Sequence, residues 1–187
     1  MSRKNGVRGL ADPSRLKPFD PDDKKMLRVV IETPKGSRSK FKFDAAARSF
    51  KLSKVLPEGM VFPYDFGYLP STKAEDGDPL DVLVLTDEPL FSGCLVDCRL
   101  LGVIEAEQEE GGKKARNDRL IAAASASLLY SEMNSLEDLN PIVLKEIQDF
   151  FVNYQRVRGV AVTILGRKGP EQARKLIRIA ADAKHAA

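Results

Sequence analysis

The stretch 75–86 joins a cluster of acidic side chains to a strand. It reads Glu-Asp-Gly-Asp-Pro-Leu-Asp-Val-Leu-Val-Leu-Thr, and its first seven residues hold four carboxylates, including Asp76, Asp78 and Asp81. Two carboxylates about 5 Å apart repel by roughly 3 kcal/mol at an effective dielectric near 20, so a converging trio needs cations, a shared proton or open water. Oxygen ligands alone on one turn suit Mg²⁺ or Mn²⁺.

The shape of this turn is fixed by two residues. Gly77 allows backbone angles that are closed to other residues, and Pro79 fixes its own φ. A polar β-turn that simply leads into a strand is an alternative interpretation. A calcium loop of the EF-hand type is excluded, because its invariant glycine would fall at Asp81 and because the aliphatic run 82–85 indicates a strand where that motif needs a helix.

The whole chain has the size and composition of one globular domain. Its 187 residues are 43% hydrophobic and 30% charged. The N-terminus is polar, unlike a signal peptide, and no apolar run approaches the roughly 20 residues that span a bilayer, so a cytoplasmic protein without a membrane partner is expected. Cys94 and Cys98 would lie about 13 Å apart along a strand, which is too far for a disulfide bond. With His185 as the only histidine, the sequence lacks a set of zinc ligands. Buried thiols are expected.

The net charge of +3 is concentrated at the N-terminus. Residues 1–25 hold seven Lys or Arg and four Asp, which leaves the remainder neutral. A neutral body argues against a nucleic-acid partner, which needs clustered cations. We therefore expect an N-terminal extension over 1–25, disordered or lying on the surface, and one folded domain over 26–187.

The patterns along the chain predict strands first and helices last. Two helices are expected, one opened by Asn140-Pro141 and running to about Tyr154, the other opened by Gly169-Pro170. The segment 107–118 is predicted to be a hairpin-type loop, and the aromatic-rich segment 59–70 to pack in the core or, alternatively, to wall a site. The expected strands are Met26–Glu32, Lys40–Asp44, Phe50–Leu56, Val82–Leu85, Cys94–Ala106, Arg119–Ala123 and Val160–Leu165. Strands followed by helices without βαβ alternation favour a closed antiparallel barrel with the helices outside.

Several of these stretches together resemble the soluble, magnesium-dependent inorganic pyrophosphatases. The motifs, in order, are Val-Val-Ile-Glu-Thr-Pro, Lys40, Phe-Pro-Tyr-Asp-Phe-Gly-Tyr, Asp-Gly-Asp-Pro-Leu-Asp-Val-Leu-Val and Phe-Phe-Val-Asn-Tyr, and the resemblance covers about 26–184. It implies a mainly β fold with an OB-like closed five-stranded barrel, extra strands and two flanking C-terminal helices. It also implies hydrolysis of pyrophosphate to two phosphates, Mg²⁺ as cofactor with Mn²⁺ as the alternative, and a homo-oligomer, a hexamer in bacteria.

The resemblance also assigns roles to residues. Asp76 and Asp81 match metal ligands, and Asp78 matches the residue that activates the attacking water beside the metal. Glu32 matches an active-site acid. The matching phosphate-binding residues are Lys40, Lys54, Arg119 and Tyr154.

This chain departs from the family pattern at several of these positions. Lys54 and Arg119 stand where an arginine and a lysine are usual, Lys42 replaces an acid, Phe66 replaces a tyrosine, and Gln155 replaces a lysine. In the family, the loop predicted here at 107–118 carries two more metal-binding aspartates. In this chain Gln108 or Glu109 stands at the first of these positions and Asn117 at the second, with Asp118 one residue out of register. Three interpretations stay open: a divergent pyrophosphatase, a phosphohydrolase for another phosphate substrate, and a catalytically impaired relative that binds phosphate or serves in assembly.

Overall fold

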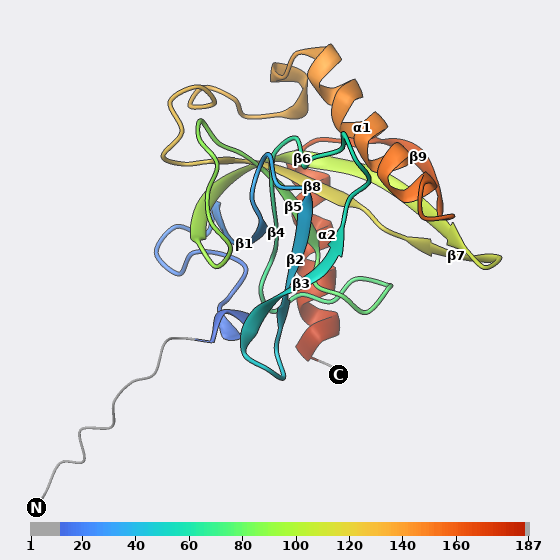
Figure 1. The fold of residues 1–187 in the computed structure, drawn as a ribbon. Coiled ribbons are helices and arrows are strands. Elements are labelled where there is room, and N and C mark those ends of the chain that lie inside the picture. The colour runs from blue at the N-terminus through green and yellow to red at the C-terminus, as the bar shows by residue number, and fades with distance from the viewer. Residues whose placement is uncertain (1–11, 186–187) are drawn as a thin grey trace, which may run out of the picture.

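The computed structural model describes residues 12–185, so residues 1–11 of the predicted extension and residues 186–187 lie outside the described part (Figure 1). The strands in this part are β1 (Met26–Thr33), β2 (Ser39–Asp44), β3 (Ser49–Val55), β4 (Asp65–Tyr68), β5 (Asp81–Leu85), β6 (Leu95–Glu110), β7 (Lys113–Arg116), β8 (Arg119–Ala124) and β9 (Ala161–Lys168). The helices are α1 (Pro141–Arg156) and α2 (Pro170–His185), with short 3₁₀ turns at Pro13–Arg15 and Leu136–Asp138. None of these helices is long and apolar enough to cross a membrane.

The strand pairings close into a ring. Within the described residues, the order β1-β4-β5-β8-β6 returns to β1, because β1 pairs with both β4 and β6. The predicted closed five-stranded architecture with extra strands and two C-terminal helices is confirmed. The prediction of purely antiparallel pairing is wrong at one place, since β5 and β8 are parallel. The chain passes through the β6–β7 hairpin between them, and β8 therefore enters beside β5 in the same direction.

The predicted loop at 107–118 is also wrong in extent. Strand β6 continues to Glu110 and β7 pairs back onto it, so that only Gly111 and Gly112 form the turn. This ribbon is exposed and charged, as in the ion pair between Lys114 and Glu107 at 2.8 Å, so its composition looks like that of a loop. Strand β9 pairs along the other edge of β6, whereas β2 and β3 form a separate hairpin.

Both faces of the ring strands are covered. In β5, Val82 and Val84 belong to a cluster that α2 covers, whereas Leu83 and Leu85 belong to a cluster that α1 covers. The two-residue period of a strand sends these pairs to opposite faces. Figure 1 shows α1 lying along β9 and α2 in a different layer. As predicted, Asn140 caps α1, its side chain accepting a hydrogen bond from the Ile142 N–H at 2.9 Å.

The aromatic-rich segment 59–70 contains a strand that the sequence patterns did not predict, β4. Phe66 lies in this strand and Phe62 just before it. Both side chains are buried, with ring centroids 5.6 Å apart, which confirms the prediction of core packing. Gly67 faces β1 so closely that an added Cβ would lie 2.2 Å from the carbonyl oxygen of Val30. Only glycine fits there, and the ring closes through this close approach.

Residues 12–25, the described part of the predicted extension, lie against the body. Phe19 forms a bridge with Leu27 and packs against the cluster under α2. Arg28 donates a hydrogen bond to Asp20 at 2.5 Å, and the Arg28 N–H donates to the Pro18 carbonyl at 2.9 Å. These contacts attach the segment to the first strand of the ring.

Candidate active site

The acidic turn before β5 has the defined shape that its sequence predicts. The Ala74 N–H donates to the Asp78 carbonyl at 2.8 Å and the Gly77 N–H to the Ala74 carbonyl at 3.0 Å, while Gly77 has φ of 88°. The Asp78 N–H also donates to the Asp76 carboxylate at 3.1 Å. The turn is thus closed by its own backbone, and its aspartates project from a fixed frame.

A cavity of about 210 Å³ opens beside this turn. Carboxylates line it from three elements: Glu32 from β1, Asp78 from the turn and Asp81 from β5. Lys42 of β2 also lines it, so the cavity brings together segments far apart in the sequence. Three acids and an amine facing one space form a site for charged chemistry.

Two of the turn aspartates are paired with cations. The Lys42 ammonium lies 2.6 Å from an Asp78 carboxylate oxygen, and the Arg119 guanidinium lies 3.0 Å from an Asp81 carboxylate oxygen. Burial, together with the charges of Asp81 and Asp78, raises the pKa of Asp76. In residues 12–185 the predicted trio therefore does not converge into a ready-made ligand group. The physical reason is mutual repulsion, which the two cations relieve.

The donor chemistry of the turn nevertheless fits a hard divalent cation. All the available ligand atoms are carboxylate oxygens, and burial first, then the charges of Asp81 and Asp78, raise the pKa of Asp76. A bound cation would relieve both effects. The Lys42 side chain is 37% exposed on an edge hairpin and can move aside, whereas the Arg119 side chain is 9% exposed and fixed. An incoming cation would compete with Lys42 for Asp78.

Glu32 is the buried acid of the cavity. Its carboxylate accepts a hydrogen bond from the Phe43 N–H at 2.7 Å. Burial is the main cause that raises its pKa to about 7, helped by the charge of Asp81 and opposed by the Phe43 hydrogen bond and by Lys40 and Lys42. Glu32 can therefore gain or lose a proton near neutral pH.

We expect Glu32→Gln to flatten the dependence of stability on pH. Since the folded-state pKa of about 7 lies above the ordinary 4.5, the folded state binds the extra proton between these values, and stability falls as pH rises through this window. Because a tenfold change in proton affinity corresponds to about 1.4 kcal/mol, the variant should gain about 2–3 kcal/mol over the wild type at pH 8 and little at pH 5. Urea unfolding of both proteins without divalent cations, from pH 5 to 8, measures this difference. Parallel curves would mean that Glu32 titrates normally.

Two lysines gather over a tyrosine at the far end of the β2–β3 hairpin. Lys40 and Lys54 are cross-strand partners, and their ammonium groups lie 5.9 and 5.8 Å from the centre of the Tyr154 ring. Burial lowers the pKa of Lys40 to about 8 and also lowers that of Lys54. The Lys40 ammonium lies 4.6 Å from the centre of the Phe66 ring. Phe66, which stands where the family usually has a tyrosine, thus contributes a cation–π contact instead of a hydroxyl group. Unneutralised ammonium groups are suited to bind an anion.

Asn117 belongs to an amide network beside Arg119. Its side-chain nitrogen donates to Gln108 at 2.6 Å, and its side-chain and backbone oxygens both accept hydrogen bonds from Arg119. The Arg119 guanidinium also lies 5.3 Å from the centre of the Phe151 ring. Asn117 thus positions Arg119 against Asp81.

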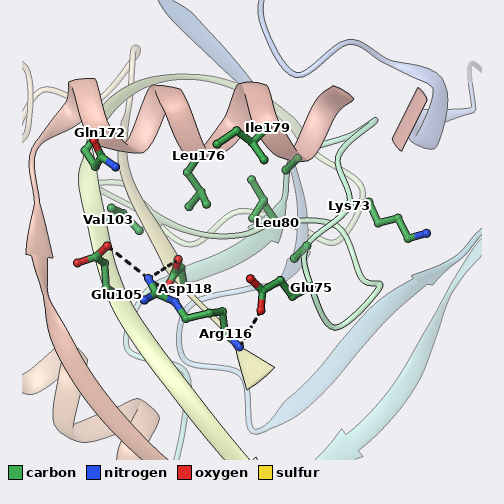
Figure 2. Close-up of a pocket in the computed structure, with 12 residues that line it drawn as sticks. Lys73, Glu75, Leu80, Val103, Glu105, Arg116, Asp118, Gln172, Leu176 and Ile179 are labelled. Atoms are coloured by element: carbon green, nitrogen blue, oxygen red, sulfur yellow. Dashed lines mark hydrogen bonds and ion pairs between the residues drawn. The ribbon is translucent and has the colours of Figure 1, made fainter. Parts of the chain in front are cut away.

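Asp118 and Glu109 lie away from this cavity. Figure 2 shows Asp118 in a neighbouring pocket of about 340 Å³ between α2 and the turn, where Arg116 pairs with Asp118 and Glu105. Asp118 also accepts a hydrogen bond from the Ala106 N–H at 2.9 Å. Glu109 is exposed on β6 beside Lys114. The structure therefore groups neither residue with the aspartates of the turn.

Comparison with known proteins identifies the family. The family model described as inorganic pyrophosphatase matches residues 29–184. The inorganic pyrophosphatase of Geobacillus stearothermophilus is 40% identical over 155 residues, covering 83% of this chain and 92% of the relative, and that of Methanosarcina acetivorans is 35% identical over 160 residues, covering 86% and 93%. This chain belongs to the inorganic pyrophosphatase family. The crystal structure of the Thermus thermophilus inorganic pyrophosphatase agrees, with a TM-score of 0.85, 31% identity and coverage of 94% of this chain and 99% of that one.

Two cations of this inorganic pyrophosphatase family member lie near the predicted site but are not among the residues given a role from the sequence. Lys42 had a usable signal, since it shares the strand parity of Lys40. Arg158 had none, because it lies beyond the expected end of the helix at Tyr154. In the structure α1 continues to Arg156, and the turn after it places the Arg158 guanidinium 5.9 Å from the centre of the Tyr154 ring.

Proposed function

We propose that this protein hydrolyses inorganic pyrophosphate to two phosphates by attack of water on one phosphorus atom. The observation that carries the proposal is the division of charge within one site, with carboxylates on the 76–81 turn and cations gathered at Tyr154. Pyrophosphate hydrolysis needs little covalent help, only positioning and neutralisation of charge, and this arrangement supplies both. Family membership supports the same reaction, and no observation favours another phosphate substrate or an impaired relative.

In this reaction the cationic side chains bind phosphate and the carboxylates transfer protons. Lys40, Lys54 and the Tyr154 hydroxyl hold phosphate oxygens, and Arg119 faces the same space from β8. Asp78 accepts a proton from the attacking water, whose oxygen forms the new bond to phosphorus as the bridging P–O bond breaks. Glu32, with its raised pKa, exchanges a proton near neutral pH.

Asp76, Asp78 and Asp81 are the residues that would hold a divalent cation. Their oxygen-only donors favour Mg²⁺, with Mn²⁺ as a second choice. When bound, such a cation supplies further neutralisation of the charge that develops on the transferred phosphoryl group. Asn117, Asp118 and Glu109, the candidates from the far loop, are not needed for this assignment, because the contacts described above engage them elsewhere.

Release of phosphate from pyrophosphate by the full chain tests the proposal. We expect turnover with Mg²⁺ and with Mn²⁺, and none with EDTA. The same assay with ATP and with p-nitrophenyl phosphate should release far less phosphate. A wild-type protein that cleaves either of these better than pyrophosphate, or that cleaves nothing at saturating metal, would contradict the proposed function.

The setting of the enzyme is part of the same proposal. The two cysteines are free in the structure, and unpaired thiols suit the reducing cytoplasm. A homo-oligomer, the hexamer that the family resemblance implies, is supported by the exposure of large apolar side chains such as Leu128 and Leu129.

A further inference from the structure

Arg158 is an exposed residue in the turn that follows α1, and backbone hydrogen bonds fix this turn. The Arg158 N–H donates to the Gln155 carbonyl at 2.9 Å, and the Gly159 N–H donates to the Arg156 carbonyl at 3.0 Å. Gly159 has φ of 76°, a left-handed conformation that favours glycine and ends the helix here. A cation at a helix C-terminus is also favoured by the helix dipole.

The Arg158 side chain turns back along the helix. Its guanidinium donates a hydrogen bond to the side-chain oxygen of Gln155 at 2.7 Å and lies 5.9 Å from the centre of the Tyr154 ring. Gln155 is buried, so this hydrogen bond fixes one edge of the guanidinium, and the Arg158 side chain also interacts with the Tyr154 hydroxyl. A guanidinium has five N–H donors, so donors remain for a ligand.

Three cations therefore surround one tyrosine. Lys40, Lys54 and Arg158 come from β2, β3 and the turn after α1, and within residues 12–185 none of them forms an ion pair with a carboxylate. Next to burial, the charge of Arg158 is the largest influence that lowers the pKa of Lys54. The buried Tyr154 hydroxyl has no hydrogen-bond partner of normal geometry among the described residues. The charges of Asp81 and Glu32 act on Lys40 without a direct ion pair, and like charges held together in this way favour a multiply charged anion between them.

We infer that Arg158 is a substrate-binding residue that contacts a phosphate group of pyrophosphate together with Lys40, Lys54 and Tyr154. The inference rests on the proposed function and extends it to a residue three positions beyond Gln155. Gln155 itself carries no charge, and its side-chain oxygen serves to orient the guanidinium. In this chain the cation of the α1 end that lies beside the Tyr154 ring thus comes from the turn after the helix.

The test compares Arg158→Met with Arg156→Met, which removes an exposed arginine from the last turn of the same helix. We expect Arg158→Met to raise the KM for pyrophosphate and the calorimetric Kd for inorganic phosphate about tenfold, with kcat within about twofold and an unchanged Tm. Arg158→Lys should keep most of the binding. Arg156→Met should match the wild type.

The double variant Gln155→Lys/Arg158→Met is the sharper control. Its lysine replaces the lost charge from one turn back, so we expect it to recover most of the affinity for phosphate. An Arg158→Met variant with the same phosphate Kd and KM as Arg156→Met would overturn the inference. If the wild type binds phosphate but does not hydrolyse pyrophosphate, the proposed function fails, and the phosphate Kd values still decide the role of Arg158.

Discussion

Asp78→Asn should lower kcat for pyrophosphate by about 10²- to 10⁴-fold, the usual contribution of a positioned general base. The amide cannot accept the proton of the attacking water, yet it has the size of the carboxylate and can still occupy its place in the turn. Because the Asp78 side chain is 59% exposed, the fold should tolerate the change, with a Tm close to that of the wild type. Steady-state phosphate release at saturating Mg²⁺ measures the effect.

A matched control is available on α1. Asp149 is 54% exposed and pairs with Lys145 at 2.6 Å, the same distance as Asp78 to Lys42, but it lies outside the cavity. Asp149→Asn should keep full activity. Calorimetry with Mn²⁺ then separates two roles of Asp78: metal affinity close to that of the wild type indicates a base, whereas an affinity loss as large as the kcat loss would indicate a ligand.

Arg119→Met is expected to destabilise the folded protein by about 3 kcal/mol in buffer without divalent cations. Arg119 is buried between Asp81 and Asn117, and breaking such a pair leaves an uncompensated carboxylate. A divalent cation can take the place of the lost guanidinium beside Asp81. Saturating Mg²⁺ should therefore raise the Tm of Arg119→Met more than that of the wild type.

Arg99→Met separates this effect from the general loss of an arginine. Arg99 donates hydrogen bonds to the backbone carbonyls of Tyr130, Ser131 and Met133, with no carboxylate among these acceptors. Its variant should lose stability without any gain in the stabilisation by Mg²⁺. Equal Mg²⁺ responses of the two variants would show that Arg119 does not compensate the charge of the acidic turn.

The shape of the acidic turn could be predicted because residues close in sequence determine it. The cations that pair with its aspartates could not be predicted. Gly77 and Pro79 shape the turn wherever it lies in a fold, so the frame of Asp76 and Asp78 follows from local chemistry. The partners Lys42 and Arg119 come from other strands, and their distances to the aspartates depend on how the β2–β3 hairpin and β8 pack. The alternation of residues along a strand predicts the face on which Lys42 lies, but not the carboxylate with which it forms an ion pair.

The extent of elements was hardest to predict where the composition is polar. The β6–β7 ribbon has charged side chains on an exposed surface, so no apolar alternation marks it as paired strands. Strand β4 is short and buried throughout, and Pro63 lies two residues before it, so it resembled an irregular core segment. Asn140-Pro141, in contrast, is a local start signal, and α1 begins there.

The strand pairings of the ring also determine the order in which elements can pack while the chain is being synthesised. The first strand, β1, finds its partner β6 only after residues 95–99 are made, and β8 completes the ring at Ala124. Helix α2, whose Ala173, Ile177 and Ala180 cover one cluster of the core, comes last. At roughly 5–20 residues per second, a ribosome leaves that apolar face uncovered for several seconds. Until α2 is made, this cluster stays open to other chains, and we expect loss of α2 to favour aggregation in the cell.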